Sequence, residues 1–405
     1  MLALTAHRLI TSTGPLEDAV VLVEDGRIVR FGARDAVEIP EKAEGRDFTD
    51  SVIAPGFIDI HIHGGAGHDV MEASDSGLEK ISRHLAKTGV TSFCPTTVTA
   101  SNNATLRAVE HLGRAIQKQS LPGAQAIGIH LEGPFISTAK CGVHPLAEIK
   151  DPSIDLLERF WQESGGTIKI VTLAPELPGA VEFTKHCVAK KIVVSLGHSN
   201  ADAAATRACI DAGASHATHT FNAMRALDHR EPGILGVVLS DDRVSADIIV
   251  DGVHVAPEVV EVFLRAKGNK AVLITDAISA TGMPDGKYKL GGFEVEVSGD
   301  RAMHNGRLAG SVLTLDRAVN YVATMMITEM VGIADKLRGE DREKVVDQVG
   351  MFSLTRAVKF ATVTPATVLK IDSGQMAAGH TADLVLLSKS HTVQSVISHG
   401  KFLVD

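Results

Sequence analysis

The feature that most constrains the fold is a regular alternation of short apolar runs and helix-like stretches through the middle of the chain. Eight runs have the composition of buried strands: 52–63, 91–98, 126–133, 168–176, 192–198, 216–220, 245–254 and 271–277. Amphipathic stretches separate most of them, for example 76–89, 103–119 and 257–269. Eight strands with intervening helices are typical of a (β/α)8 barrel. We therefore predict an α/β fold with a TIM-like barrel.

A doubly wound open sheet is the rival architecture. Such a sheet more often carries a glycine-rich phosphate loop after its first strand. The segment 63–69, "HGGAGHD", is rich in glycine but lacks the G-x-G-x-x-G spacing before a helix. The barrel is therefore the favoured interpretation.

Both ends of the chain are rich in predicted strands. Residues 19–32 contain an Asp25-Gly26 turn between two apolar runs, which is a strong hairpin signal. Residues 382–388 and 392–405 also have strand-like patterns. We predict that segments 1–54 and 366–405 together form a small β-sandwich domain. Segment 55–365 is the predicted barrel, with a β-hairpin insertion around 287–308.

Charge and cysteine content exclude several classes of protein. The formal net charge is -9, so nucleic acid is not an expected partner, because no basic excess is available to neutralise phosphates. The four cysteines form no CxxC pair, which fits a reducing compartment. No signal peptide or apolar run of about 18 residues is apparent, so we expect a cytoplasmic protein without a membrane span.

Most of the apolar runs end in polar residues suited to metal binding or proton transfer. They are His61, His63, His130, Glu132, His198, His219, Asp251, His254 and Asp276. In a barrel, the carboxyl ends of the strands converge on the face that holds the active site. Each residue alone has an ordinary alternative; Ser199 or Asn200, for example, could simply cap a helix after His198. The combination predicts a metal centre.

Imidazole and carboxylate ligands without thiolates suit a divalent zinc, iron, manganese or cobalt ion. Such an ion would lower the pKa of a bound water and polarise a carbonyl group. A catalytic centre of this kind also needs a proton carrier. Asp276, in "LITDAISATG", is the best candidate, because a carboxylate that is not a ligand can accept a proton and later donate it.

An ordered set of motifs resembles a known family. The set comprises "PGFIDIHIHG", "HLEGPF", "GHSNA", "THTFNAM", "REPG", "DGVHV", "TDAISATG" and "LAGS", between residues 55 and 311. Together they resemble the N-acetylglucosamine-6-phosphate deacetylases of the amidohydrolase superfamily. The resemblance implies hydrolysis of the acetamide of that sugar phosphate, one or two divalent metal ions per subunit, and a homodimer.

The resemblance also implies roles for individual residues. Glu132, His198 and His219 would hold one metal ion, and His61 and His63 would add a second. Asp276 would be the general base and then the general acid, and His144 would polarise the acetamide carbonyl. The implied substrate-binding residues are Val143, His144, Asn222, Ala223, Arg230, Asp251, His254, Leu308, Ala309 and Gly310.

Three alternatives remain open from the sequence. The substrate could be another amino-sugar phosphate, such as N-acetylgalactosamine 6-phosphate. The barrel could be a non-catalytic scaffold, although the full set of candidate ligands counts against this. A cyclic-amide hydrolase such as a dihydroorotase is the third, but the run ending in "TLAPE" lacks the lysine that bridges two metals there. Glu132 would bridge the metals instead.

Overall fold

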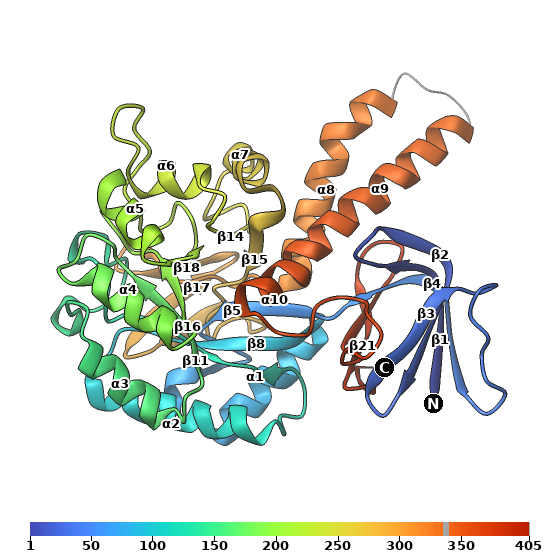
Figure 1. Ribbon diagram of the computed structural model, residues 1–405, viewed down its shortest axis with the longest axis horizontal. Coiled ribbons are helices and arrows are strands. Elements are labelled where there is room, and N and C mark those ends of the chain that lie inside the picture. Colours follow the sequence, from blue (N-terminus) through green and yellow to red (C-terminus); the bar gives the residue numbers. More distant parts are fainter. Residues whose placement is uncertain (335–339, 405) are drawn as a thin grey trace. The chain divides into compact units, whose positions relative to one another are not determined.

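The computed structural model describes residues 1–334 and 340–404, and the chain divides into two compact units (Figure 1). One unit comprises Met1–Ile58, Leu85–Ser92 and Leu315–Asp405, and the other comprises Asp59–His84 and Phe93–Thr314. The boundaries at 1–54, 55–365 and 366–405 remain a prediction about independent domains.

Each of the eight predicted runs overlaps one strand of a barrel. The strands are β5 (Phe57–Ile62), β8 (Val90–Thr97), β10 (Ile129–Glu132), β11 (Ile168–Leu173), β12 (Val193–Leu196), β13 (His216–Ala217), β14 (Ala246–Ile249) and β15 (Ala271–Ile274). Strands β5 to β13 pair in chain order in one sheet, with the short β9 (Gln125–Ala126) beside β8, and β14 pairs in parallel with β15.

Backbone hydrogen bonds join these two sheets on both sides. The Thr220 N–H donates to the Asp247 carbonyl at 2.9 Å, which links the segment after β13 to β14. The Asp276 N–H donates to the His61 carbonyl at 2.9 Å, which links the end of β15 to β5. The strands thus close on themselves, and the predicted TIM-like barrel is confirmed.

One helix follows each of the first seven barrel strands. The helices are α1 (Asp75–Lys87), α2 (Asn102–Lys118), α3 (Ile154–Glu163), α4 (Ala180–Ala189), α5 (Ala203–Asp211), α6 (Gly233–Ser240) and α7 (Pro257–Lys267). Polar side chains cap the N-termini of several of these helices. Asp202, for example, accepts a hydrogen bond from the Ala205 N–H at the start of α5. Ser199 and Asn200 instead bind Glu176, so neither is the helix cap.

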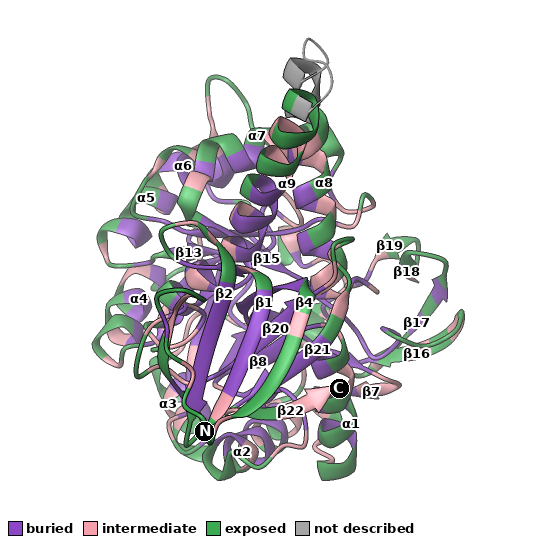
Figure 2. Ribbon diagram, turned by 90° about the vertical axis from the view of Figure 1, so that its right-hand side faces the viewer, coloured by how far each residue is buried: buried purple, intermediate pink, exposed green. Residues whose placement is uncertain are grey.

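Both ends of the chain contribute to one seven-stranded sheet. Its strands are β1 (Leu2–Ile10), β2 (Pro15–Glu24), β3 (Arg27–Ala33), β4 (Glu44–Pro55), β20 (Leu384–Leu387), β21 (Val393–Ser398) and β22 (Lys401–Val404). Antiparallel pairing of β20 with β4 joins the two ends of the chain. The sheet has buried apolar side chains on both faces, and Figure 2 shows the buried run of β2. The predicted β domain from both termini is confirmed.

The predicted turn between β2 and β3 is tightly constrained. Asp25 and Gly26 both adopt positive φ angles, 50° and 75°. Two successive residues of this kind match the twist of a two-residue hairpin, which explains the Asp-Gly sequence.

Three further helices complete this unit: α8 (Leu315–Ala334), α9 (Glu340–Phe360) and α10 (Val363–Leu369). Helices α8 and α9 lie side by side as a helical hairpin (Figure 1). Among the described residues, no helix combines the length and the apolar character that crossing a bilayer would require.

A four-stranded antiparallel sheet, the hairpin sheet, follows β15 in the unit Asp59–His84 and Phe93–Thr314, which we call the barrel unit. Its strands are β16 (Gly286–Leu290), β17 (Phe293–Ser298), β18 (Arg301–His304) and β19 (Arg307–Leu308). It packs through Leu290 and Val295 against Val98 and Ile278 of the barrel unit. The remaining short elements are β6 (Gly64–Gly65), β7 (His68–Asp69), η1 (Val70–Glu72), η2 (Thr138–Lys140), η3 (Leu146–Glu148) and η4 (Gly268–Lys270).

Candidate metal centre

The five predicted metal ligands meet at the carboxyl ends of the barrel strands. His61 and His63 lie at the end of β5, Glu132 is the last residue of β10, and His198 and His219 follow β12 and β13. All five are at most 5% exposed. Burial of so many polar side chains together is costly unless they are paired or bind an ion.

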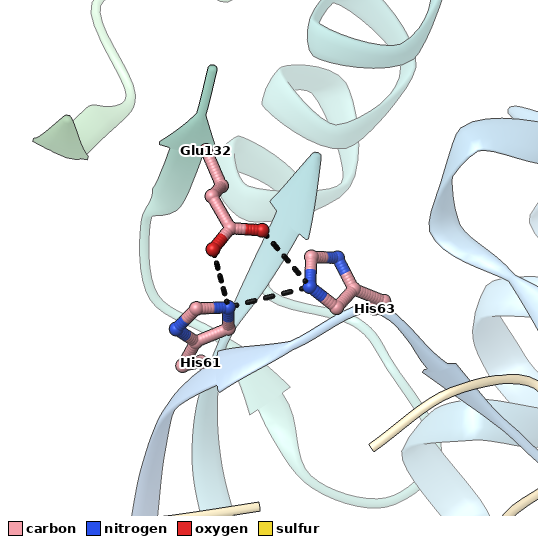
Figure 3. A group of neighbouring side chains, drawn as sticks. All are labelled: His61, His63 and Glu132. Carbon is pink, nitrogen blue, oxygen red and sulfur yellow. Dashed lines mark hydrogen bonds and ion pairs between the residues drawn. The ribbon is translucent and has the colours of Figure 1, made fainter. Parts of the chain in front are cut away.

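Glu132 lies at the centre of the group. Its Oε1 is 3.0 Å from His219 Nε2, 3.3 Å from His198 Nε2 and 3.4 Å from His61 Nε2. Its Oε2 is 3.3 Å from His63 Nε2, and Figure 3 shows the two carboxylate oxygens facing the two β5 imidazoles. One carboxylate therefore lies close to both pairs of histidines.

Two three-residue groups have the geometry of a metal site. Glu132 belongs to both, with His61 and His63 in one group and His198 and His219 in the other. Within each group the candidate ligand atoms all lie within 4.8 Å of one another. This all-nitrogen-and-oxygen set fits zinc or another divalent first-row metal.

Backbone carbonyls orient two of the imidazoles. His63 Nδ1 is 2.9 Å from the Thr96 carbonyl, and His198 Nδ1 is 2.9 Å from the Lys140 carbonyl. Because a carbonyl only accepts, each Nδ1 must carry a proton, and each neutral imidazole has its lone pair on Nε2. Both lone pairs face Glu132, so the observed orientation suits metal ligands.

When no metal ion is bound, burial and the neighbouring carboxylates shift the pKa values of the histidines in this group. Burial alone would lower the pKa of His219, but the hydrogen bond and the charge of Glu132 outweigh burial and raise it to about 9. His63 likewise has a raised pKa despite burial, through Asp276 and Glu132. Burial dominates at His198 and lowers its pKa to about 4. Metal binding would therefore have to displace protons from His63 and His219.

Asp276 lies beside the β5 histidines. Its Oδ1 is 3.1 Å from His63 Nε2 and 3.5 Å from His61 Nε2. Burial would raise the pKa of Asp276, but the charges of His61 and His63 and a hydrogen bond from His63 outweigh burial and lower the pKa to about 2. An ionised carboxylate at this position can accept a proton.

Three of these residues hold left-handed backbone conformations. His198, His219 and Asp276 have φ angles of 44°, 30° and 52°. Such angles are unfavourable for residues other than glycine, by about 1–3 kcal/mol each, and occur often at functional sites. Asp247 stabilises one of them, because its carboxylate accepts the His219 N–H and pairs with His216 at 2.9 Å.

A cavity of about 210 Å³ opens over the cluster. Its lining includes His63, Glu132, His198, His219, Asp276 and seven of the predicted substrate-binding residues: Val143, His144, Asn222, Ala223, His254, Leu308 and Gly310. His144 Nε2 is 3.5 Å from Glu132 Oε2. The side-chain nitrogen of Asn222 is buried without a hydrogen-bond partner, which leaves it available to a ligand.

Three predicted substrate-binding residues do not line this cavity. Asp251 lies behind His254, accepting a hydrogen bond from its Nδ1 at 2.7 Å. Ala309 is fully buried in the apolar cluster of the hairpin sheet. Arg230 is exposed in the loop before α6, and its backbone N–H donates to Asp228.

His130 shares the inward face of β10 with Glu132 but has a different environment. Its Nε2 lies 2.8 Å from Thr172 Oγ1, and its Nδ1 lies 3.1 Å from the Ile60 carbonyl. Burial holds the pKa of His130 well below its ordinary value. The structure therefore satisfies His130 within the barrel and leaves it outside both candidate metal groups.

The cavity also has three lining residues that the sequence reasoning missed: Val98, Gly142 and Leu290. Val98 directly follows β8, so the strand-end pattern could have identified it. Gly142 and Leu290 lie in a loop and at the end of β16, and no periodic pattern places them at the cavity.

Comparison with known proteins places these observations in a family. The Amidohydrolase family model matches residues 52–403. The chain is 36% identical over 396 residues to N-acetylglucosamine-6-phosphate deacetylase of Bacillus subtilis (strain 168), covering 97% of this chain and 94% of that protein. It is also 36% identical over 402 residues to N-acetylgalactosamine-6-phosphate deacetylase of Escherichia coli O157:H7, covering 98% of each.

A solved structure agrees over the whole chain. It is a mutant N-acetyl-D-glucosamine-6-phosphate deacetylase from Mycobacterium smegmatis in complex with N-acetyl-D-glucosamine-6-phosphate. The TM-score is 0.88 and the sequence identity 34%, with 100% of this chain and 99% of that chain covered.

Proposed function

Because this chain belongs to the amidohydrolase family, we propose that it hydrolyses the acetamide of N-acetylglucosamine 6-phosphate to glucosamine 6-phosphate and acetate. The observation that carries this proposal is the Glu132-centred group of buried histidines with the ionised Asp276 beside it; all of these residues except His61 line one cavity.

Glu132, His198 and His219 would hold one divalent metal ion, and His61 and His63 with Glu132 would hold a second. When bound, such an ion supplies an activated water and polarises the acetamide carbonyl. The nitrogen and oxygen donors of both groups suit zinc, iron, manganese or cobalt.

Asp276 and His144 would carry the proton transfer and the charge stabilisation. Asp276 accepts a proton as the water oxygen bonds to the carbonyl carbon. His144 donates a hydrogen bond to the carbonyl oxygen as negative charge develops there. Asp276 then gives its proton to the amine nitrogen as the C–N bond breaks, which leaves acetate and the free amino sugar.

The sugar phosphate needs donors in an acidic chain. Asn222 offers an unpartnered side-chain nitrogen, and His254 lines the same cavity with its orientation fixed by Asp251. Arg230 does not line the cavity of its own chain. We propose that it contacts the phosphate of the substrate bound in a second subunit. Arginine can grip phosphate with two donors, so a homodimer would complete the site.

The enzyme would work in the cytoplasm. Its four cysteines are free buried thiols, which suits a reducing compartment.

The test of this function is acetate release by metal-loaded protein. Asp276→Asn keeps the shape of the side chain but removes the proton acceptor, and we expect it to lose most of the turnover. Asp383→Asn is the matched control, because Asp383 is a buried carboxylate in the other unit that binds Ser398 and His399. Near-normal turnover in Asp276→Asn would contradict the proposed proton transfer.

N-acetylgalactosamine 6-phosphate is a second candidate substrate, because a relative of equal identity bears that name. The two sugars differ only at the C4 hydroxyl, so kcat/KM should be compared for both with one preparation. We expect the N-acetylglucosamine derivative to be preferred, and a reversed preference would assign the galactosamine derivative.

A further inference from the structure

The hydrogen bonds of His144 differ from those of the candidate metal ligands. His144 Nδ1 lies 3.2 Å from the backbone nitrogen of Thr99, and the Thr99 N–H points at it. The same Nδ1 lies 2.7 Å from Thr99 Oγ1. One threonine thus contacts this ring nitrogen through both its backbone and its side chain.

A backbone N–H can only donate, so the nitrogen that it faces must offer a lone pair. A proton on His144 Nδ1 would point at the Thr99 proton. The Thr99 hydroxyl can donate or accept and so fits either tautomer, whereas the backbone N–H fits only an unprotonated Nδ1. The backbone contact therefore places the ring proton of the neutral imidazole on Nε2. This is the opposite of His63 and His198, whose Nδ1 atoms face carbonyl oxygens and must carry the proton.

We propose that Thr99 is a positioning residue that fixes the tautomer of His144. His144 then presents an Nε2–H donor to the cavity, whereas His63 and His198 present lone pairs. This inference rests on the proposed function for one step only, namely that the group receiving the Nε2–H bond is the acetamide oxygen.

The surroundings of His144 support this assignment. Its Nε2 is 3.5 Å from Glu132 Oε2, farther than that of His63 at 3.3 Å, and His144 belongs to neither candidate metal group. A donor at Nε2 is also unsuited to metal binding, which needs the lone pair. His144 therefore lines the cavity as a hydrogen-bond donor beside the ligand groups.

The space around Thr99 is specific. Thr99 is 3% exposed and His144 7% exposed, so no bulk water competes for the Nδ1 atom. A Cβ at Gly133 would come within 2.0 Å of Thr99 Oγ1. Gly133, with φ +78°, leaves the room that the threonine hydroxyl occupies.

Nitrogen NMR tests the tautomer without any substrate. The zinc-loaded protein, which is diamagnetic, would be labelled with nitrogen-15 histidine, and the His144 signals would be assigned by their absence from His144→Gln. We expect an unprotonated Nδ1 and a protonated Nε2. A proton on Nδ1 would overturn the proposal, whatever the enzyme's activity.

Two substitutions test which nitrogen acts. The amide nitrogen of glutamine can occupy the place of Nε2, whereas that of asparagine lies near Nδ1. If the Nε2–H is the donor, His144→Gln should retain a kcat at least about tenfold above that of His144→Asn, as expected for loss of a single oxyanion donor. Equal activities, or a better asparagine variant, would overturn the donor role.

The side chain of Thr99 has its own matched set. Thr99→Val keeps the shape and the backbone N–H, and we expect kcat to fall by about tenfold with KM little changed, as for other residues that orient a catalytic group. Thr99→Ser should restore most of the loss. Thr184→Val, at a buried threonine bound to the Ala180 carbonyl, controls for loss of a buried hydroxyl. Wild-type kcat in Thr99→Val would overturn the role of the hydroxyl.

These outcomes separate the two proposals. If the wild-type protein releases no acetate but has its His144 proton on Nε2, the tautomer assignment stands and the proposed substrate fails. If acetate is released and the proton is on Nδ1, the function stands and the positioning role of Thr99 fails.

Discussion

Single contacts decide whether three imidazoles of this centre, those of His63, His198 and His144, present a lone pair or a proton at Nε2. The deciding contact is on the far side of the ring: a carbonyl at His63 and His198, and a backbone N–H at His144. Sequence can place His63 and His198 at strand ends, but it cannot show which backbone group each Nδ1 contacts. That contact depends on the depth and rotation of each strand end in the closed barrel.

Asp247 supports His219 from behind, and we expect its removal to loosen the metal centre. In Asp247→Ala the His219 N–H loses its acceptor, so the left-handed conformation of His219 loses the hydrogen bond that stabilises it. Metal affinity should fall by about 10- to 100-fold, as is usual when residues that orient a ligand are lost. Metal titration by calorimetry checks this, with the exposed Asp242→Ala as control. Equal affinity in both variants would contradict the bracing role.

We predict that His61 and His63, the β5 pair, bind a second metal ion rather than the first. Replacing both His61 and His63 with alanine leaves Glu132, His198 and His219 as one complete group. We expect metal content by mass spectrometry to fall by one ion per subunit, with some acetate release retained. Unchanged metal content and unchanged activity together would show that the pair binds no metal.

The metal-free protein should lose stability as the pH rises. The pKa of His219 in the folded chain is about 9, against about 6.5 when unfolded, so the folded state holds this proton more tightly. The resulting stabilisation is complete below about pH 6.5 and is lost as the pH rises through 9. The unfolding temperature of metal-free protein should therefore fall between pH 7 and 9.5. In His219→Gln that fall should be smaller, and an equal fall would contradict the assignment.

At the scale of elements, hydrophobic pattern was sufficient for the barrel strands and for the paired ends of the chain. Each apolar run contains most of a strand because a strand buried on both faces is apolar along most of its length. The same reasoning led to Glu132 at the end of β10 but did not separate it from His130. The two side chains share a face, and only the closed barrel shows that His130 is satisfied by Thr172 and Ile60.

Other cavity residues depend on loop conformation or on a second chain. Gly142 and Leu290 reach the cavity through the loop after β10 and through the hairpin sheet, and neither segment has a periodicity that predicts its path. Arg230 is exposed in its own chain, so its predicted role depends on an assembly that one sequence does not describe.

The β2–β3 hairpin offers a test of local conformation. Gly26→Ala would strain a left-handed residue and also place a Cβ 2.8 Å from the His399 carbonyl oxygen. Gly379→Ala is a matched control in the same unit, because Gly379 is also left-handed, with φ +85°, but has open space around its Cβ. Backbone strain should lower the free energy of unfolding of both variants by about 1 kcal/mol. In Gly26→Ala the clash should lower the free energy of unfolding by about 1–3 kcal/mol more, as measured by thermal unfolding. Equal losses would contradict this close approach.

At the scale of the whole molecule, the barrel unit contains every residue of the candidate centre and its cavity. Full-length similarity to known deacetylases agrees with the chemistry inferred from these residues. We propose that Glu132 and the histidines around it hold the metal on which acetate release depends.

The most direct measurement of that claim combines metal content and acetate release in one preparation. Protein stripped of metal should be inactive towards N-acetylglucosamine 6-phosphate, and activity should return in proportion to bound zinc, iron, manganese or cobalt. Glu132→Gln, which weakens both metal groups at once, should lose bound metal and acetate release together. Full activity in metal-free protein, or full metal content and activity in Glu132→Gln, would contradict the claim.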